Sequence, residues 1–404
     1  MTAFPSLSFP AGQKAGGEFP FRAWSGGMRV LGNIALVVVA IVVGVGLIEI
    51  AGRLYFGRSL EGSYYVYGGA PVQFDAVSGF RLRPGPIHET RITRGQIEYV
   101  GLYKPNSLGF QSSEFAPQRQ DGRRRIAVFG DSFSQADYLA RNWPSYVEAT
   151  SFAEGHPLQL LNFSLGGTGL ANWWSILKNM AGAYELDGVV FAVWEENLYR
   201  QFLVTHSEGQ KWWLGRVPSW DPARYPKTLD EAMRVMAPMA GDFYFTDESG
   251  FLDALSGEWR PREARRWFVE RQVAALWEPR EQPGRVTALP ILDPADAAAR
   301  ERQIADIAAI IAARQWRATV AYIPSRPGLL DPGSDAAFKA ETLRFAEMIG
   351  ASFHDGSEVY AGMSDTEIRR HFLPYDAHWN LAGSDLFGRF MLRTLSAPTP
   401  QRLP

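Results

Sequence analysis

The motif Gly130-Asp131-Ser132-Phe133 offers a serine hydroxyl directly after the apolar run Ile126-Ala-Val-Phe129. If the run is a strand that feeds a helix, Ser132 lies at the carboxyl end of that strand, where open parallel sheets bind ligands. The start of the helix adds a backbone N–H that can stabilise negative charge. Alone the motif is weak, because Asp and Ser are also ordinary N-cap residues.

The segment Asp376-Ala-His378-Trp379 near the C-terminus supplies an imidazole and a carboxylate. In an extended segment residues two apart point the same way, so Asp376 and His378 leave the backbone on one side. A serine hydroxyl needs a base to take its proton, and a carboxylate fixes the imidazole and stabilises its charged form. We therefore predict that Ser132, His378 and Asp376 form a catalytic triad for acyl transfer. The plainer alternative is a surface Asp–His pair beside the last helix.

Two further segments follow apolar runs and carry hydrogen-bond donors. Asn162-Phe-Ser-Leu-Gly-Gly167-Thr-Gly169 follows one run, and Asn197 follows another. We expect the backbone N–H groups of Ser132 and Gly167 and the side-chain amide of Asn197 to form an oxyanion hole. The alternatives are that Gly167 only permits a tight turn and that Asn197 caps a helix. Candidate substrate contacts beside these groups are Asp131, Trp194 and Trp379.

Apolar runs alternate with segments of helical pattern beyond residue 123. This order predicts an α/β fold with a parallel sheet that is covered on both faces. The predicted strands are 126–129, 158–163, 188–193 and 318–323, and the clearest predicted helices are 297–313, 336–349 and 381–395.

The residues from Val30 to Ile48 are apolar except for Asn33. A helix needs roughly 20 apolar residues to cross a bilayer, whereas the core of a signal peptide has about 7 to 15. We therefore predict a retained transmembrane helix over 30–50, with a cleaved leader or a buried helix as the alternatives. Positive charges precede and follow it, so the positive-inside rule only weakly favours a cytoplasmic N-terminus and an extracytoplasmic catalytic domain, periplasmic if the source is Gram-negative.

The chain divides into segments of different character. Residues 199–292 carry six tryptophans and no convincing strand, so we expect a mostly helical insertion whose tryptophans either stack on sugars or pack against the main domain. The predicted organisation is a cytoplasmic tail (1–29), the transmembrane helix (30–50), a stalk and N-terminal elaboration (51–122), a catalytic domain (123–396, with the insertion at 199–292) and a C-terminal tail (397–404).

Composition excludes several classes of protein. The formal net charge is only −2 and the chain has no cysteine, so a nucleic-acid binder, a disulfide framework and a thiolate nucleophile are all disfavoured. The six histidines are scattered without the spacing of metal ligands, so we expect no metal site. Acyl transfer from serine requires no cofactor.

Taken together, these motifs resemble the four conserved blocks of the SGNH, or GDSL, hydrolase superfamily. The resemblance places the block I serine on Ser132, the block II glycine on Gly167, the block III asparagine on Asn197, and the block V pair on Asp376 and His378. It implies a three-layer, flavodoxin-like fold. The usual block V has two residues between Asp and His. This chain has one, followed by Trp379, which resembles the Asp-x-His-Trp element of SGNH-like proteins in alginate and related polysaccharide O-acetylation.

The resemblance implies an acyl-serine mechanism on an ester, with water or a sugar hydroxyl as acceptor. With the predicted anchor, it favours an esterase or O-acyltransferase that acts on O-acetyl esters of an envelope or exported polysaccharide. For a transferase, the resemblance implies a membrane-bound acyl-donor protein as a partner. The alternatives are a lysophospholipase or thioesterase at the membrane surface, and a non-catalytic carbohydrate-binding assembly subunit.

Overall fold

The structure is a computed structural model that describes residues 21–56, 63–67, 72–93, 96–205, 211–214 and 288–396. Helix α1 (Phe21–Phe56) belongs to a unit of its own. Its segment Val30–Ala51 is long and apolar enough to cross a membrane, and its apolar side chains are exposed along most of that length. A continuous exposed apolar surface of this kind is typical of a segment that contacts a membrane or another protein.

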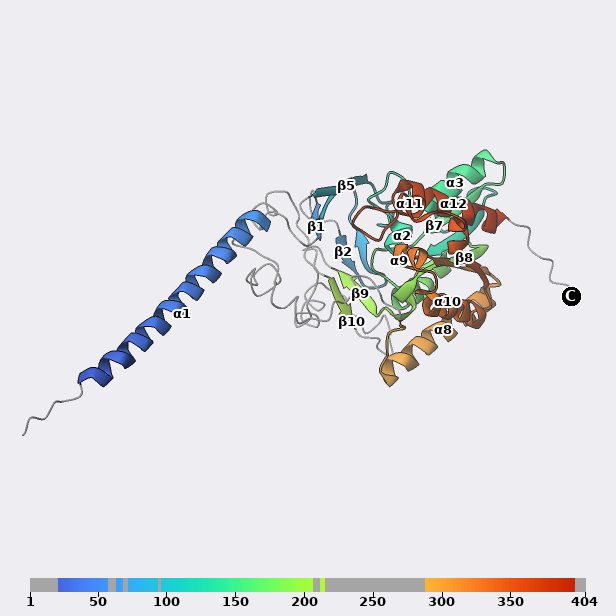
Figure 1. Ribbon diagram of the computed structural model, residues 1–404. Coiled ribbons are helices and arrows are strands. Elements are labelled where there is room, and N and C mark those ends of the chain that lie inside the picture. The colour runs from blue at the N-terminus through green and yellow to red at the C-terminus, as the bar shows by residue number, and fades with distance from the viewer. Residues whose placement is uncertain are drawn as a thin grey trace, which may run out of the picture. The chain divides into compact units, whose positions relative to one another are not determined.

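A parallel sheet of five strands forms the centre of the second unit (Figure 1). Its spatial order is β12-β11-β8-β6-β7, so in chain order the strands are arranged 2-1-3-4-5, which is the flavodoxin-like order. This confirms the predicted fold class. The strands are β6 (Arg124–Phe129), β7 (Leu158–Asn162), β8 (Gly188–Trp194), β11 (Arg317–Ile323) and β12 (Ser352–Asp355).

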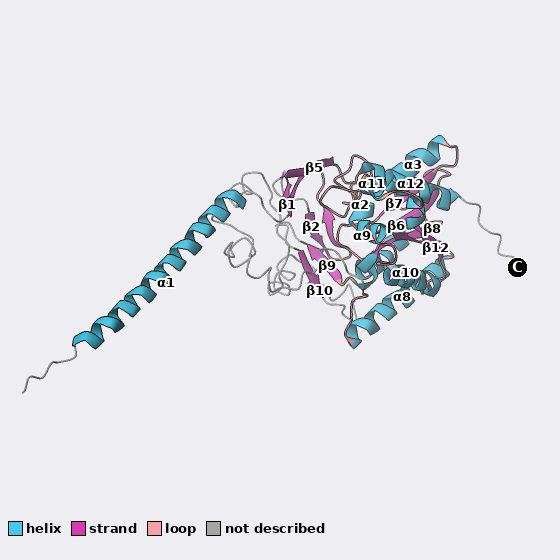
Figure 2. Cartoon of the chain, in the orientation of Figure 1, coloured by secondary structure: helices cyan, strands magenta, loops and turns pink. Residues whose placement is uncertain are grey.

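Successive residues of each central strand enter two separate cores, because side chains alternate across a sheet. Ala127 and Phe129 of β6 pack with α4 (Leu170–Asn179), α8 (Pro294–Arg314) and α10 (Ala336–Met348). Their neighbours Ile126 and Val128 pack with α3 (Trp143–Ala153) and α12 (Leu381–Ser396). The result is the expected arrangement of three layers, with helices on both faces of the sheet (Figure 2).

The helix that begins at the serine motif is short. Helix α2 (Ser132–Gln135) ends after one turn, where Ala136 has a left-handed backbone with φ 42°. The chain becomes helical again at α3, where Asn142 caps the N-terminus and Pro144 lies in the first turn. The remaining short helices are α9 (Arg326–Leu330), α11 (Asp365–Arg369), η1 (Ala181–Ala183), η2 (Glu195–Tyr199) and η5 (Gly356–Tyr360).

The segment before the central sheet contains strands that the sequence analysis did not predict. Three of them form an antiparallel sheet in the order β1-β4-β5, and two form the hairpin β2-β3. Polar and charged residues interrupt their apolar pattern, so the alternation typical of strands is weak. The strands are β1 (Ser63–Tyr67), β2 (Val72–Asp75), β3 (Gly79–Leu82), β4 (Ile87–Thr93) and β5 (Gln96–Tyr103).

The start of the expected helical insertion is also a pair of strands. β9 (Phe202–Thr205) and β10 (Lys211–Leu214) form an antiparallel hairpin, so the expectation that this segment lacks strands is wrong there. The side-chain amide of Asn172 on α4 bonds both the N–H and the C=O of Leu203, which fixes β9 against the main domain. The rest of the predicted insertion, from residue 215 to 287, lies outside the described residues.

Candidate active site

Ser132 lies at the carboxyl end of β6, at the first position of α2. Asp131 is the N-cap residue of this helix, and its Oδ1 accepts a hydrogen bond from the backbone N–H of Phe133 at 3.0 Å. Gly130 has no room for a side chain, since an added Cβ would collide with Ser134. The tight turn that presents the serine hydroxyl therefore depends on glycine at this position.

Asp376 and His378 lie in a closed loop rather than in an extended segment. The loop is closed by a bridge between Phe372 and Trp379 and by a bond from Leu373 N–H to the carbonyl oxygen of His378 at 2.9 Å. Within the loop the backbone N–H of His378 donates to Asp376 Oδ1 at 3.1 Å. The loop thus holds both side chains in one orientation before any substrate binds.

The structure brings the three predicted residues into a hydrogen-bonded row. Ser132 Oγ lies 2.5 Å from His378 Nε2, and His378 Nδ1 lies 2.7 Å from Asp376 Oδ1. In this order Asp376 accepts from Nδ1–H, which leaves Nε2 free to accept the serine proton. The arrangement has the geometry that a serine nucleophile needs.

Asp376 is a buried carboxylate that stays charged. Burial alone would raise its pKa, but the charge and hydrogen bond of His378 and the charge of Arg91 hold that pKa well below the usual value of 3.8. The ion pair joins Asp376 Oδ2 to Arg91 Nη1. A fixed negative charge stabilises the imidazolium that forms when His378 takes the serine proton.

Aromatic rings fix the plane of the imidazole. The ring centroid of Phe133 lies 4.8 Å from that of His378, and that of Tyr138 lies 5.9 Å away at a steep angle. The hydroxyl of Tyr138 donates to the carbonyl oxygen of Trp379 at 2.9 Å. The imidazole is therefore held by packing as well as by hydrogen bonds, and its side chain remains 23% exposed.

Two backbone N–H groups beside the serine remain available. Those of Ser132 and Gly167 donate no hydrogen bond to another group in the part of the chain that the structure describes. Gly166 adjoins the serine, since a Cβ placed on it would lie 3.7 Å from the Cβ of Ser132. Gly167 has a left-handed backbone with φ 77°, a conformation that glycine adopts without strain. These two groups are the best candidates for an oxyanion hole.

The side-chain amide of Asn197 has another role than the one expected. It is fully buried, and its two hydrogens go to Asp131 Oδ2 at 2.9 Å and to the carbonyl oxygen of Thr168 at 3.2 Å. Its Oδ1 accepts from the backbone N–H of Trp194 at 2.6 Å. Because no N–H of this amide is free, the expected donation by Asn197 to an oxyanion is wrong in this structure.

Burial also contradicts two of the three expected substrate contacts. Asp131 is 1% exposed, and its Oδ2 pairs with Arg200 at 3.1 Å in addition to Asn197. Trp379 is fully buried and packs edge-on against Phe133. Trp194, the third candidate, is only half-buried and stacks on Phe133 at 5.8 Å. Trp194 therefore stays a candidate for contact with substrate.

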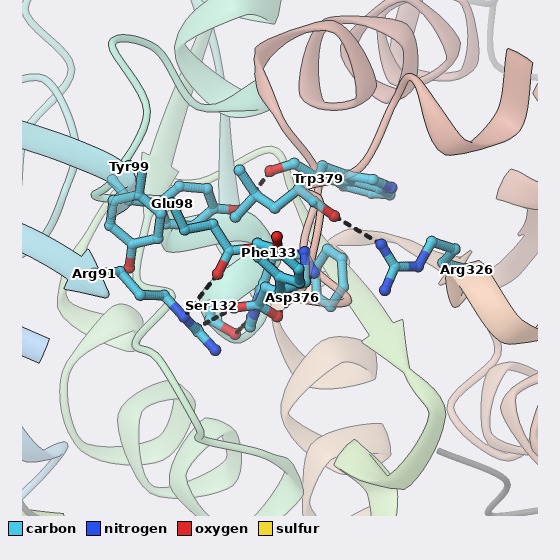
Figure 3. A network of polar contacts seen from close by, with 12 residues as sticks. Arg91, Glu98, Tyr99, Ser132, Phe133, Arg326, Asp376 and Trp379 are labelled. Atoms are coloured by element: carbon cyan, nitrogen blue, oxygen red, sulfur yellow. Dashed lines mark hydrogen bonds and ion pairs between the residues drawn. The ribbon is translucent and has the colours of Figure 1, made fainter. Parts of the chain in front are cut away.

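Sequence reasoning missed the groups that surround the triad. Gln135 accepts from the N–H of Gly166 and donates to Asp137 at 2.6 Å. Burial raises the pKa of Asp137, although hydrogen bonds from backbone N–H groups and Tyr103 and the charge of His378 oppose the shift. Arg91 and Glu98 reach Asp376 from β4 and β5 (Figure 3). Gln135 and Asp137 follow Ser132 closely enough to be suspected, whereas nothing local to Arg91 or Glu98 indicates the site.

No protein-family model and no curated protein matches the chain. Among solved structures, it is similar to the esterase EstA from Pseudoalteromonas sp., with 14% identity over 67% of this chain and 96% of that one and a TM-score of 0.35. It is also similar to a catalytic mutant of Axe2, an acetylxylan esterase from Geobacillus stearothermophilus, with 9% identity over 70% of this chain and 100% of that one and a TM-score of 0.36.

A third similar structure is LAE5, an alpha/beta hydrolase from the metagenome of Lake Arreo, with 12% identity over 68% of this chain and 97% of that one and a TM-score of 0.37.

Proposed function

We propose that this protein is a serine-dependent esterase or O-acyltransferase that acts on short acyl esters of a polysaccharide outside the membrane. The observation that carries the proposal is the hydrogen-bonded row from Ser132 through His378 to Asp376, with contacts of 2.5 and 2.7 Å. The two available N–H groups beside the serine supply the second requirement of acyl transfer.

The proposed reaction has two halves. In the first, Ser132 Oγ attacks the ester carbonyl carbon while His378 Nε2 takes its proton. The tetrahedral oxyanion is held by the N–H groups of Ser132 and Gly167. The ester C–O bond then breaks, and the leaving alcohol takes the proton from His378, which leaves an acyl-serine. In the second half, water or a sugar hydroxyl gives its proton to His378 Nε2 and attacks the carbonyl carbon of the acyl-serine. The bond from that carbon to Ser132 Oγ then breaks, His378 returns the proton to Oγ, and the acid or the new ester is released.

The substrate class rests on two further observations. Helix α1 is long and apolar enough to anchor the catalytic domain at a membrane. The Asp376-Ala-His378-Trp379 element resembles that of polysaccharide O-acetylation proteins. The choice between hydrolysis and transfer depends on how well the site excludes water and orients a sugar hydroxyl.

The test uses the full-length protein in detergent and a model aryl acetate. We expect release of the aryl alcohol that Ser132→Ala abolishes and that Arg119→Met, a change near the opposite end of the sheet where Arg119 pairs with Asp187, leaves unchanged. Equal rates for the wild type and Ser132→Ala would refute the proposal.

Acyl-chain length separates the sugar and lipid substrates. We expect kcat/KM to be at least about tenfold higher for the aryl acetate than for the aryl octanoate. A preference for octanoate would instead favour a lipid hydrolase. Acetyl transfer from the aryl acetate to an added oligosaccharide, followed by mass spectrometry, distinguishes the transferase from the hydrolase.

A further inference from the structure

Two charged residues from the N-terminal sheet contact the loop that carries the triad. Arg91 on β4 forms an ion pair through Nη1 with Asp376 Oδ2, and its Nε lies 3.3 Å from Glu98 Oε2 on β5. The side chains of Arg91, Glu98 and Asp376 are 11%, 0% and 8% exposed, respectively. Arg91 therefore lies between two buried carboxylates (Figure 3).

Glu98 also holds the backbone of the loop. Its Oε1 accepts hydrogen bonds from the N–H of Tyr375 at 2.8 Å and from the N–H of Asp376 at 2.7 Å. The loop is thus held in two ways. Glu98 binds its backbone N–H groups, and Arg91 binds the side-chain carboxylate of Asp376. Bonds to a buried charged group are stronger than neutral ones, and leaving such a group unpaired is costly.

A break in the strand pairing aims both side chains at the loop. Arg91 pairs with Tyr99 across β4 and β5, but the next residue, Ile92, pairs with Ile97. Glu98 is therefore the extra residue of a β-bulge. Bulges are frequent next to active sites, where they redirect a side chain.

Strand β5 also contacts Tyr138, a neighbour of the imidazole. Gly101 of β5 lies against Tyr138, so closely that a Cβ on this glycine would come within 2.8 Å of the Cα of Tyr138. The ring of Tyr99 packs 4.8 Å from that of Tyr138, which itself contacts His378. The β4–β5 pair therefore contacts the carboxylate of the triad directly and supports its imidazole through Tyr138.

We propose that Arg91 and Glu98 are positioning residues, and that the β4–β5 pair completes the active site by fixing Asp376 against His378. The proposal rests on the proposed function for its kinetic consequences. Oδ2 of Asp376 is held by Arg91, so Oδ1 stays directed at Nδ1 of His378. Glu98 neutralises the buried positive charge of the Arg91 guanidinium.

The test compares Arg91→Met, Arg91→Lys and Glu98→Gln with wild type in the full-length protein, with Arg119→Met as the matched control. We expect Arg91→Met to lower kcat by about 10- to 100-fold with KM nearly unchanged. Arg91→Lys keeps the charge, so it should restore part of kcat. Glu98→Gln keeps the size of the side chain but removes the charge that pairs with Arg91, so it should also lower kcat with KM nearly unchanged.

A role confined to general stability would reduce the amount of active enzyme, but kcat per active site, counted by titration with a fluorophosphonate, would keep the wild-type value. Wild-type kcat in Arg91→Met and Glu98→Gln, together with an inactive Ser132→Ala, would overturn the inference while leaving the proposed function intact.

Hydrogen exchange tests the same inference without activity. We expect Glu98→Ala to speed exchange of the Tyr375 and Asp376 amides by about tenfold or more, whereas Arg119→Met should leave it unchanged. Unchanged exchange in Glu98→Ala would overturn the inference even if the wild type hydrolyses no ester.

Discussion

Asp376 holds His378 at two points, because its Oδ1 lies 2.7 Å from the ring Nδ1 and 3.1 Å from the backbone N of the same residue. A single carboxylate oxygen thereby fixes both the tautomer of the imidazole and the shape of the loop.

Replacing Asp376 by Asn keeps the size of the side chain but removes the charge that stabilises the imidazolium. We expect kcat for the aryl acetate to fall by about 10⁴-fold, with KM changed little. Steady-state kinetics from pH 6 to pH 9 measures both constants. A loss of less than tenfold would show that Asp376 is not the orienting carboxylate.

The oxyanion site can be tested at Gly167. Alanine at this position would be strained by the left-handed backbone conformation, and its Cβ would lie 3.1 Å from Leu203 Cδ2. We expect Gly167→Ala to lower kcat by about 10- to 100-fold, since it displaces one of the two donors. The control is Gly155→Ala, which has the same backbone cost at φ 76° but no neighbour within 4 Å of the added Cβ. Equal kcat values in the two variants would exclude Gly167 as a donor.

Asn197 is expected to act through the fold. Its amide and carbonyl join Asp131, Thr168 and the backbone of Trp194 in a buried network. We predict that Asn197→Ala lowers the free energy of unfolding by about 2 to 3 kcal/mol, because it leaves buried polar groups of its neighbours without their hydrogen-bond partner. Denaturant titration followed by tryptophan fluorescence measures this loss. Unchanged stability with a large fall in kcat would restore the direct role expected from the sequence.

The raised pKa of Glu195 predicts that the free energy of unfolding depends on pH. Burial and the charges of Glu196 and Asp335 raise its pKa from 4.5 to about 7, although a hydrogen bond from Ser325 and the charge of Arg200 oppose the shift. Between pH 4.5 and pH 7 the folded protein therefore binds this proton more tightly than the unfolded chain does. The contribution of Glu195 to the free energy of unfolding is therefore fully present below pH 4.5 and is lost as the pH rises through 7.

Glu195→Gln should consequently be more stable than wild type above pH 7, by about 1 to 3 kcal/mol. At pH 4 this gain in the free energy of unfolding of Glu195→Gln over wild type should be smaller by about 1 to 3 kcal/mol, because wild-type Glu195 is then protonated in both states. Denaturant midpoints at the two pH values measure it, with the exposed Glu154→Gln as control. A difference independent of pH would contradict the assignment.

The sequence was most informative where apolar runs are continuous. Runs such as 188–193 become fully buried parallel strands, and the helices that cover them have clear periodicity. Strand β12 was missed because Ser352-Phe-His-Asp355 at the sheet edge has only one apolar residue. The strands β1 to β5 were missed because charged residues such as Arg91 and Glu98 occupy them for tertiary reasons that no local pattern expresses.

The triad itself was accessible from residue types and order, since Ser132 follows a strand and His378 lies two residues from Asp376. The roles of the neighbouring polar groups were not accessible. Whether the amide of Asn197 points toward the Ser132 hydroxyl or toward Asp131 depends on side-chain orientation. That orientation is set by contacts with Thr168 and Trp194 from other parts of the chain.

The most direct test of the account is the reactivity of Ser132 toward a fluorophosphonate, followed by intact-mass and peptide mass spectrometry of the full-length protein. The account predicts one phosphonyl group, located on Ser132, with labelling slowed at least about 100-fold in His378→Ala because the base that activates the hydroxyl is gone. No adduct on Ser132, or equal labelling rates in the wild type and His378→Ala, would contradict it.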